Sequence, residues 1–584
     1  MRMISETFII EAGDRLLFRV KADAAPGASL VTLRSTDDGA VLFDLKGVSS
    51  TVYIPVEWDL SAYAGESAIL DVRRESCSVA ECCLYGKGVL NDGARFFWAE
   101  NGFLRVIGAG SIRSRFARDP HRPLFHFSPV MNWMNDPCGL IRWRGEYHMF
   151  YQYHPFSSFW GPMHWGHAVS GDLVHWRYLP VALAPDTPEH ADDFSGIFTG
   201  SAVDDNGVLT LVYTDHRDTR YCVDRIMQSQ SVASSDDGIV FKKFADNPVI
   251  ASRPDGCAED FRDPKVWRED GEWRMVLGSR MEGRGQVLLY GSKDLKHWEY
   301  GGVLFRATRD GVGMYECPDF FPLGEGHALL ASVVEERGGV KEFYTILVTG
   351  AFREGAFVPE RETRFDFGPD FYAPQSFLDD KGRRIVIAWM ENWGNSFLTH
   401  PSGWSGAATL PRTIETNSRG EILIRPVEEL EALRKTVQPA VEMSGKALDT
   451  SLLPVHSDLD LFEVMLEFTP LEKGAHCGLV IAGKDGGEVA VFYDADQSRV
   501  VIDRGAMVLG EKGIFAERID PEENGLVRLH VFCDRSSVEV FAGGYRAAGT
   551  ARVYFKEPGR RADIFSRGRV DLVRCALWEL ASAW

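Results

Sequence analysis

Three acidic residues stand in sequence surroundings that could support catalysis. Asp136 follows Asn135 and precedes a proline. Asp263 follows Arg262, and Glu316 precedes a Cys-Pro pair. Three carboxylates that meet in one place can supply a nucleophile, a proton donor and a charge that binds substrate hydroxyls, which is the equipment of a retaining glycosidase. Taken alone, each acid is also compatible with a turn or a salt bridge, so the inference depends on the elements that would bring the three together.

A repeated unit around these acids predicts such an element. Ser170–Trp176 reappears as Ser292–Trp298, and a weaker copy covers Ser234–Phe241. The copies are roughly 60 residues apart and each precedes a strand pattern, which is typical of the blades of a β-propeller. The inner strands of neighbouring blades converge on one axis, where acids distant in sequence can meet. We therefore predict a five-bladed β-propeller catalytic domain over residues 119–420.

The stretch that contains Asp136 runs directly into a predicted hairpin. Two strand patterns flank a turn at Arg144 and Gly145,. This arrangement places Asp136 on the approach to a hairpin, where the backbone can hold a short acidic side chain rigidly.

The N-terminal residues 1–118 read as short strands separated by turns rich in Gly, Pro and Asp. Expected strands cover residues 7–10, 15–20, 29–33, 41–45, 51–56 and 68–73. The pattern predicts a β-sandwich-like accessory domain. The segment Trp58–Gly65 fits a sugar-binding module, and a purely structural appendage is an equally good interpretation.

The C-terminal third of the chain also alternates between strands and turns. Residues 441–584 predict a second β-sandwich, in which Asp534 and Glu539 are expected to be surface or turn groups. Between propeller and sandwich, Pro426–Lys435 has a proline at its start, acids in its first turn and bases in its last, which predicts a helix. We place this helix in a linker over residues 421–440. The predicted fold class is therefore all-β.

Composition limits the classes of function. The 584-residue chain is 45% hydrophobic and 25% charged, so it predicts two or three globular domains,. Its formal net charge of −20 argues against nucleic-acid binding,. No apolar stretch predicts a membrane span, and no secretory signal is evident, so a cytoplasmic location is expected. The ten cysteines lack metal-ligand spacing, and we expect neither a metal nor another cofactor,. The oligomeric state stays open.

Several longer motifs follow one another in a specific order. An almost continuous run extends from Phe125 to Asp186. The further motifs are Gly196–Ala202, Arg262–Pro264, Glu316–Phe320, Asp370–Gln375, Ala388–Met390 and Leu410–Arg412. Together they resemble glycoside hydrolase family 32, the invertases, inulinases and levanases. The resemblance covers the predicted propeller and C-terminal sandwich, while the first 118 residues fall outside the common core.

The resemblance implies hydrolysis of β-D-fructofuranosides with retention of configuration, through a covalent fructosyl-enzyme. It makes Asp136 the nucleophile, Glu316 the acid/base and Asp263 the stabiliser of the transition state. Glu316 must then carry a proton near neutral pH, which neighbouring carboxylates favour, while Asp136 must stay ionised. By motif position, the residues expected to bind the fructose-containing oligo- or polysaccharide are Asn135, Gln152, Trp160, Phe198, Thr199, Arg262 and Trp389.

Two departures from the family pattern flank the expected pocket and leave open the linkage preference and the balance between hydrolysis and transfer, but not the reaction class. The chain has Cys138 where family members usually have Asn, and Thr199 where they usually have Ser. A small packing residue is the preferred interpretation of Cys138. The alternatives are a fructosyltransferase that uses the same intermediate and a non-catalytic fructan-binding protein, and the presence of all three carboxylates argues against the second. Sucrose, a phosphorylated sucrose, inulin and levan all remain open as substrates, as does exo or endo cleavage.

Overall fold

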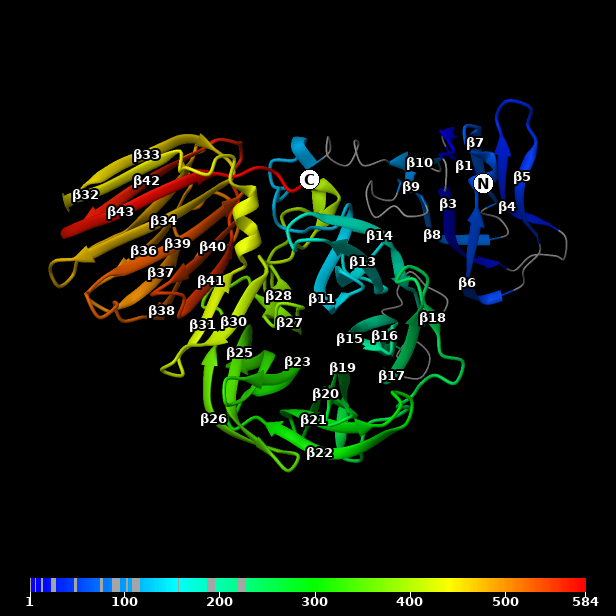
Figure 1. Ribbon diagram of the computed structural model, residues 1–584, viewed down its shortest axis with the longest axis horizontal. Coiled ribbons are helices and arrows are strands. Elements are labelled where there is room, and N and C mark those ends of the chain that lie inside the picture. Colours follow the sequence, from blue (N-terminus) through cyan, green and yellow to red (C-terminus); the bar gives the residue numbers. More distant parts are fainter. Residues whose placement is uncertain are drawn as a thin grey trace.

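The computed structural model describes residues 2–5, 7–11, 14–22, 28–46, 50–73, 77–86, 95–100, 103–107, 116–155, 157–185, 195–218 and 226–584. Their regular secondary structure is nearly all β-strand, as predicted. Figure 1 shows three regions in a row: the N-terminal strands, a central group of sheets and the C-terminal sandwich. No helix among these residues has the length and hydrophobicity needed to cross a membrane.

The N-terminal region contains all six expected strands, but they do not form two separate sheets. Its elements are β1 (Arg2–Ser5), β2 (Phe8–Ile9), β3 (Asp14–Ala22), β4 (Ser29–Ser35), β5 (Val41–Lys46), β6 (Ser50–Asp59), η1 (Ser61–Tyr63), β7 (Ser67–Arg73), β8 (Cys77–Gly86), β9 (Arg95–Glu100) and β10 (Phe103–Ile107). The strands are hydrogen-bonded as one ten-stranded sheet, because β1 pairs with β7 on one side and with β10 on the other. Trp58 is buried against Phe18 and Phe43, so it serves this core rather than a sugar-binding surface.

The central region consists of five consecutive sheets. The first contains β11 (Asn132–Trp143), β12 (Glu146–His154), β13 (His164–Ser170) and β14 (Trp176–Leu183), and the second β15 (Gly196–Asp205), β16 (Val208–Asp218), β17 (Ile226–Ser235) and β18 (Lys242–Lys243). The third contains β19 (Cys257–Glu269), β20 (Glu272–Met281), β21 (Arg284–Ser292) and β22 (Trp298–Arg306), and the fourth β23 (Val312–Leu323), β24 (Gly326–Arg337), β25 (Val340–Arg353) and β26 (Ala356–Arg364). The fifth contains β27 (Tyr372–Leu378), β28 (Arg384–Trp389), β30 (Arg412–Thr416) and β31 (Ile422–Pro426).

The repeated unit found in the sequence has the same structural role in each copy. Ser170–Trp176 connects the third and fourth strands of the first sheet, and Ser292–Trp298 does so in the third sheet. In the first copy the Asp172 carboxylate accepts hydrogen bonds from the next backbone N–H groups, and the indole N–H of Trp176 donates to the carbonyl of Leu173. The second copy repeats these bonds. The sequence repeat is therefore a repeated turn that immediately precedes the outermost strand of its sheet.

The five sheets contact one another in a cycle. The first strand of each sheet touches the first strand of the next, from β11 through β15, β19 and β23 to β27, and β27 in turn contacts β11. A short strand from the fifth-sheet segment, β29 (Trp404–Ser405), also pairs in parallel with β11. Figure 1 shows the sheets arranged around a common centre. The acids on β11, β19 and β23 are thus carried on strands that share this centre.

Each of these five inner strands has an irregularity in its pairing with the second strand of its sheet. The pairing register shifts at residues 134–137, 198–200, 262–265, 316–319 and 372–375. Within three of these shifts, Asp263, Cys317 and Ala373 have positive φ angles of 65°, 48° and 49°. A bulge re-aims side chains, and bulges gather beside active sites. The predicted hairpin turn is also present, with positive φ at Arg144 and Gly145.

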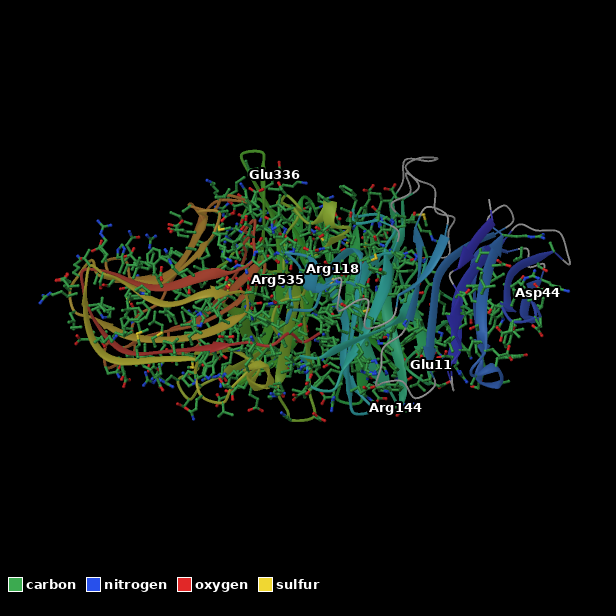
Figure 2. All side chains as sticks on the ribbon, turned by 90° about the horizontal axis from the view of Figure 1, so that it is seen from above. Glu11, Asp44, Arg118, Arg144, Glu336 and Arg535 are labelled. Carbon is green, nitrogen blue, oxygen red and sulfur yellow. The ribbon has the colours of Figure 1, made fainter. Side chains whose placement is uncertain are left out.

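The C-terminal region is a two-sheet sandwich around one apolar core. One sheet contains β32 (Val441–Asp449), β34 (Phe462–Pro470), β39 (Val527–Asp534), β40 (Ser537–Ala542), β41 (Ala547–Arg552) and β43 (Arg569–Glu579). The other contains β33 (Leu452–Leu459), β35 (His476–Gly483), β36 (Glu488–Asp494), β37 (Arg499–Asp503), β38 (Ile514–Arg518) and β42 (Arg560–Arg567). Figure 2 shows the sandwich at one end of an elongated molecule and the N-terminal strands at the other.

The linker is shorter than expected. Residues 422–426 are strand β31 of the fifth sheet, and only Glu428–Leu433 is helical, as the 3₁₀-helix η3. Leu430 and Leu433 are buried, so this segment packs on the core instead of forming the longer helix predicted from its charges.

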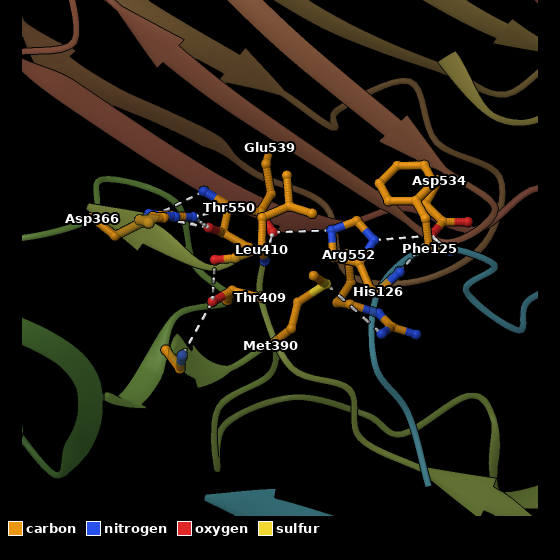
Figure 3. Close-up of polar contacts among 12 residues, drawn as sticks. Phe125, His126, Asp366, Met390, Thr409, Leu410, Asp534, Glu539, Thr550 and Arg552 are labelled. Carbon is orange, nitrogen blue, oxygen red and sulfur yellow. Dashed lines mark hydrogen bonds and ion pairs between the residues drawn. The ribbon is translucent and has the colours of Figure 1, made fainter. Parts of the chain in front are cut away.

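Asp534 and Glu539 are not surface groups, in contrast to the expectation. Both are fully buried and hold the imidazole of His126 between them, with His126 Nδ1 2.9 Å from Asp534 and Nε2 3.1 Å from Glu539 (Figure 3). Glu539 also pairs with Arg412 at 2.6 Å. Sequence patterns missed this role because the partners are up to about 400 residues away. The sandwich and the central sheets are therefore joined by buried ion pairs.

Candidate active site

Asp136 is held by three donors at the register shift of β11. Thr199 Oγ1 donates to Asp136 Oδ2 at 2.6 Å, and Asn135 Nδ2 donates to Oδ1 at 2.9 Å. The Cys317 thiol donates to Oδ2 at 3.4 Å. The Asn135 amide is itself oriented by the indole N–H of Trp133 at 2.6 Å. Burial raises the pKa of Asp136, and the bonds from Thr199 and Asn135 oppose that rise by stabilising the carboxylate,.

Asp263 is the most buried of the three acids, with 4% exposure. Its left-handed backbone turns the side chain toward the backbone N–H of Cys317, which donates to Oδ2 at 2.9 Å. Its own N–H donates to Thr214 Oγ1 at 3.0 Å. Burial raises the pKa of Asp263 to about 7, with Arg262 opposing and Glu316 and Asp136 adding to the rise.

Glu316 is oriented by two donors from neighbouring strands. Arg262 Nη2 lies 2.7 Å from Oε1, and the Tyr372 hydroxyl donates to Oε2 at 2.5 Å. The other guanidinium nitrogen of Arg262, Nη1, donates to Asp260 at 2.6 Å. Arg262 therefore serves two acids, and both oxygens of Glu316 have fixed partners.

The two cysteines near the acids are packed thiols. The Cys317 thiol lies 3.4 Å from Asp136 and 3.7 Å from Asp263, so it links these two carboxylates. Cys138 is fully buried in an apolar cluster, consistent with the packing role expected for it. Burial and the nearby Asp136 hold the pKa of both thiols well above their usual value. Both groups are thus kept as neutral thiols rather than reactive thiolates.

The acids line one cavity of about 610 Å³. All but one of the residues selected from the sequence line it with them: Asn135, Asp136, Gln152, Trp160, Phe198, Thr199, Arg262, Asp263 and Glu316. The exception is Trp389, which is fully buried behind the wall. Its ring lies 5.9 Å from that of Trp133 and 4.9 Å from that of Trp393, and Trp393 reaches the cavity instead.

Other lining residues were not selected from the sequence. They are His216, Asp218, Ile226, Gln228, Glu259, Asp260, Arg280, Cys317, Tyr372 and Trp393. Some signal existed for Cys317 and Tyr372, because each lies inside a sequence motif, on β23 and β27 respectively. His216 and Gln228 lie at the cavity ends of β16 and β17, and Phe198 stacks on His216 with centroids 4.0 Å apart. Such second and third strands carry no local motif.

The comparisons with known proteins agree with this geometry. Residues 126–426 match the model of the glycosyl hydrolases family 32 N-terminal domain, and residues 429–579 match that of the family 32 C-terminal domain. The chain belongs to glycoside hydrolase family 32 and is a glycoside hydrolase.

Named relatives cover most of the chain. A sucrose-6-phosphate hydrolase of Escherichia coli is 39% identical over 470 residues, which is 78% of this chain and 94% of the relative. A raffinose invertase of Escherichia coli is 37% identical, over 78% of this chain and 95% of the relative. The structure of a family 32 β-fructofuranosidase of Bombyx mori covers 81% of this chain and 97% of its own, with TM-score 0.70 and 30% identity. These structural relatives support the expected combination of a propeller with a β-sandwich.

Proposed function

We propose that this enzyme hydrolyses terminal β-D-fructofuranosides with retention, at the centre of a five-bladed propeller formed by the five central sheets. The observation that carries the proposal is the convergence of Asp136, Asp263 and Glu316 on one cavity from three different sheets. An oxocarbenium-like transition state needs an anion on one face and a proton donor at the leaving oxygen. The cyclic contacts of the inner strands support the blade arrangement.

In the first step Asp136 attacks the anomeric carbon of fructose while Glu316 protonates the departing oxygen. The bond between carbon and leaving oxygen breaks, and an ester between fructose and Asp136 forms. In the second step Glu316 removes a proton from water, which attacks the same carbon and releases Asp136. The donors on Asp136 fix its rotamer before the attack, so little reorganisation is needed,.

Asp263 binds fructose hydroxyls beside the reacting carbon in this scheme, and its ionised form stabilises the positive charge of the transition state. Arg262 pairs with Glu316 at 2.7 Å and lies 4.0 Å from Asp263, where its positive charge opposes the rise in the pKa of Asp263 and favours the ionised form. Trp160 and Phe198 supply apolar walls, with ring centroids 6.3 Å apart. Trp389 lies behind the cavity wall, where it packs against Trp133 and Trp393 and supports their positions.

The charge of the cavity favours uncharged substrates such as sucrose and fructo-oligosaccharides. Its described lining includes six acids and two arginines. Both arginines are occupied, since Arg262 and Arg280 lie 2.6 Å and 3.0 Å from Asp260. A phosphorylated sugar would bring further negative charge to these carboxylates. We therefore expect kcat/KM to be higher for sucrose than for sucrose 6-phosphate, although several relatives are named for the phosphorylated sugar.

The test is hydrolysis of sucrose followed by NMR at early times. A retaining enzyme releases the β-anomer of fructose before mutarotation, and Asp136→Asn should abolish turnover while leaving the fold intact. Early release of the opposite anomer, or an active Asp136→Asn enzyme, would refute the mechanism.

The cytoplasmic location stays part of this proposal, and the six free buried cysteines of the described chain support a reducing compartment,.

A further inference from the structure

A buried ionic contact joins the C-terminal sandwich to the edge of the active site. Arg504 Nη1, just after β37, donates to Asp370 Oδ2 at 2.9 Å, and the backbone N–H of Arg552 donates to the same oxygen at 2.7 Å. The exposed fractions of Arg504, Asp370 and Arg552 are 3%, 0% and 2%. Two sandwich residues thus donate hydrogen bonds to one carboxylate of the central region.

Asp370 is close in sequence to Tyr372, which contacts the proposed acid/base Glu316. Asp370 lies two positions before Tyr372, which is the first residue of β27. The Tyr372 hydroxyl donates to Glu316 Oε2 at 2.5 Å. A shift of Asp370 would therefore move the hydroxyl that orients Glu316.

Asp370 also holds the loop that follows β28. Asn395 Nδ2 donates to Asp370 Oδ1 at 2.5 Å and to Glu391 Oε2 at 3.0 Å. Glu391 is approached from the sandwich by Arg552 Nε at 3.5 Å and by the Tyr554 hydroxyl at 3.3 Å. The Glu391 end of the short segment 391–395 is therefore tied directly to sandwich residues, and the Asn395 end is tied to them through Asp370.

That segment carries Trp393 into the cavity. Trp393 is stacked on Trp133 with centroids 5.9 Å apart and an interplanar angle of 18°, and it lines the cavity. Asn392 shapes the turn, since its side-chain oxygen accepts from the N–H of Gly394 at 2.6 Å and its amide donates to the carbonyl of Pro369 at 2.7 Å. The position of the Trp393 indole therefore depends on the same contacts as Tyr372.

We propose that Arg504 is a positioning residue of the active site: through Asp370 the C-terminal sandwich fixes both the Tyr372 hydroxyl and the Trp393 indole, and thereby sets the affinity for the fructoside. The sandwich is then a working part of the cavity wall and more than a stabilising appendage. The inference rests on the proposed function, because it assumes that a fructoside occupies this cavity.

The test compares kcat and KM for sucrose in the full-length enzyme and in Arg504→Met. Loss of the guanidinium removes the cation paired with the buried Asp370, while the backbone N–H of Arg552 and the Asn395 amide remain. We expect the carboxylate to shift and KM to rise on the order of 10-fold, with a smaller fall in kcat, because misplaced binding groups are costly. Arg504→Lys keeps a charge near Asp370 and should restore part of the affinity.

A matched control separates positioning from general stability. Arg504 donates to the Asp370 carboxylate and, at 2.8 Å, to the carbonyl of Arg552. Arg560 is 1% exposed and has the same kind of pairing inside the sandwich, since its guanidinium donates to Asp460 at 2.6 Å and to the carbonyl of Arg535 at 2.5 Å. Arg560→Met should lower the melting temperature as Arg504→Met does. Below both melting temperatures its KM should equal that of the wild type.

If Arg504→Met does not fold, Tyr554→Phe removes one hydroxyl from Glu391 without removing a charge, and we expect its KM to rise about 2–3-fold. Wild-type KM values in every Arg504 and Tyr554 variant that folds would overturn the inference, as would an equal rise in Arg560→Met. Absence of wild-type activity on sucrose and on every other fructoside would overturn the proposed function instead, so the two failures are distinguishable.

Discussion

The Thr199 hydroxyl lies 2.6 Å from Oδ2 of Asp136 and is the shortest contact described for that carboxylate. Thr199 sits at the register shift of β15, so the irregularity of one sheet supplies a donor to the acid of the neighbouring sheet. The hydroxyl opposes the rise that burial imposes on the pKa of Asp136. From the sequence, Thr199 is expected to bind the fructoside, with Thr in place of the usual Ser.

Thr199→Val should therefore raise the pKa of Asp136 further, because it removes a donor that stabilises the charged form. Activity that requires ionised Asp136 is lost as pH falls through this pKa, so the acidic limb of the kcat/KM profile should move to higher pH. Thr199→Ser keeps the hydroxyl and should leave the limb in place. An unmoved limb in Thr199→Val would show that the hydroxyl does not control Asp136.

Glu316→Gln tests the acid/base. It should lower kcat for sucrose by about 10²–10⁴-fold, the usual contribution of general acid catalysis. Aryl fructosides with good leaving groups need little protonation, so their first step should be affected much less. Equal losses for good and poor leaving groups would make Glu316 a structural residue.

The raised pKa of Asp263 makes the stability of the folded protein depend on pH. Its pKa is about 7 in the folded protein against 3.8 ordinarily, so the folded state binds the proton more tightly than the unfolded state. This contribution to stability is full below pH about 4, declines as pH rises and is lost above pH about 7. Asp263→Asn should therefore raise the melting temperature at pH about 8 by a few degrees, with little change near pH about 4, while activity falls.

Asp260→Asn is a control, because the pKa shift of Asp260 and its effect on stability have the opposite sign to those of Asp263. Despite burial, Arg262 and Arg280 hold the pKa of Asp260 below its usual value, so its ionised form stabilises the fold. That contribution is present above the ordinary pKa and lost as pH falls. Asp260→Asn should lower the melting temperature at neutral pH. A loss of stability in Asp263→Asn at pH about 8 would contradict the assignment of a raised pKa.

The N-terminal strands supply none of the described cavity lining, which falls between residues 135 and 393. A chain that begins at Phe116 should therefore keep kcat/KM for sucrose within about 2-fold of the full chain, as expected for a separate domain. The comparison is made on purified proteins at equal active-site concentration. A large rise in KM would assign the N-terminal strands a role in substrate binding.

Much of the site could be predicted because its acids lie on inner strands, where motif and position coincide. The turns after Ser170 and Ser292 revealed the period of the sheets for the same reason: each is a local arrangement set by an Asp and a Trp a few residues apart. Local sequence determines such turns, and the structure contains both of them.

Contacts between distant segments could not be predicted in this way. Asp534 and Glu539 carry no local mark of their buried partners, so they looked like turn acids. Trp389 matched a motif, yet Trp393 reaches the cavity because Asp370 and Glu391 hold the following loop. The charges of Glu428 and Lys435 suggested a long helix, and burial of two leucines decided for a single short 3₁₀ segment.

The most direct test of the mechanism is to find the covalent fructosyl-enzyme on Asp136. Glu316→Gln with an activated aryl fructoside should form the ester quickly and hydrolyse it slowly, because the second step lacks its base. Acid quenching, proteolysis and mass spectrometry should then place a fructosyl group on the peptide that contains Asp136, and Asp136→Asn should abolish it. Rapid turnover with no label, or a label on a peptide without Asp136, would contradict the account.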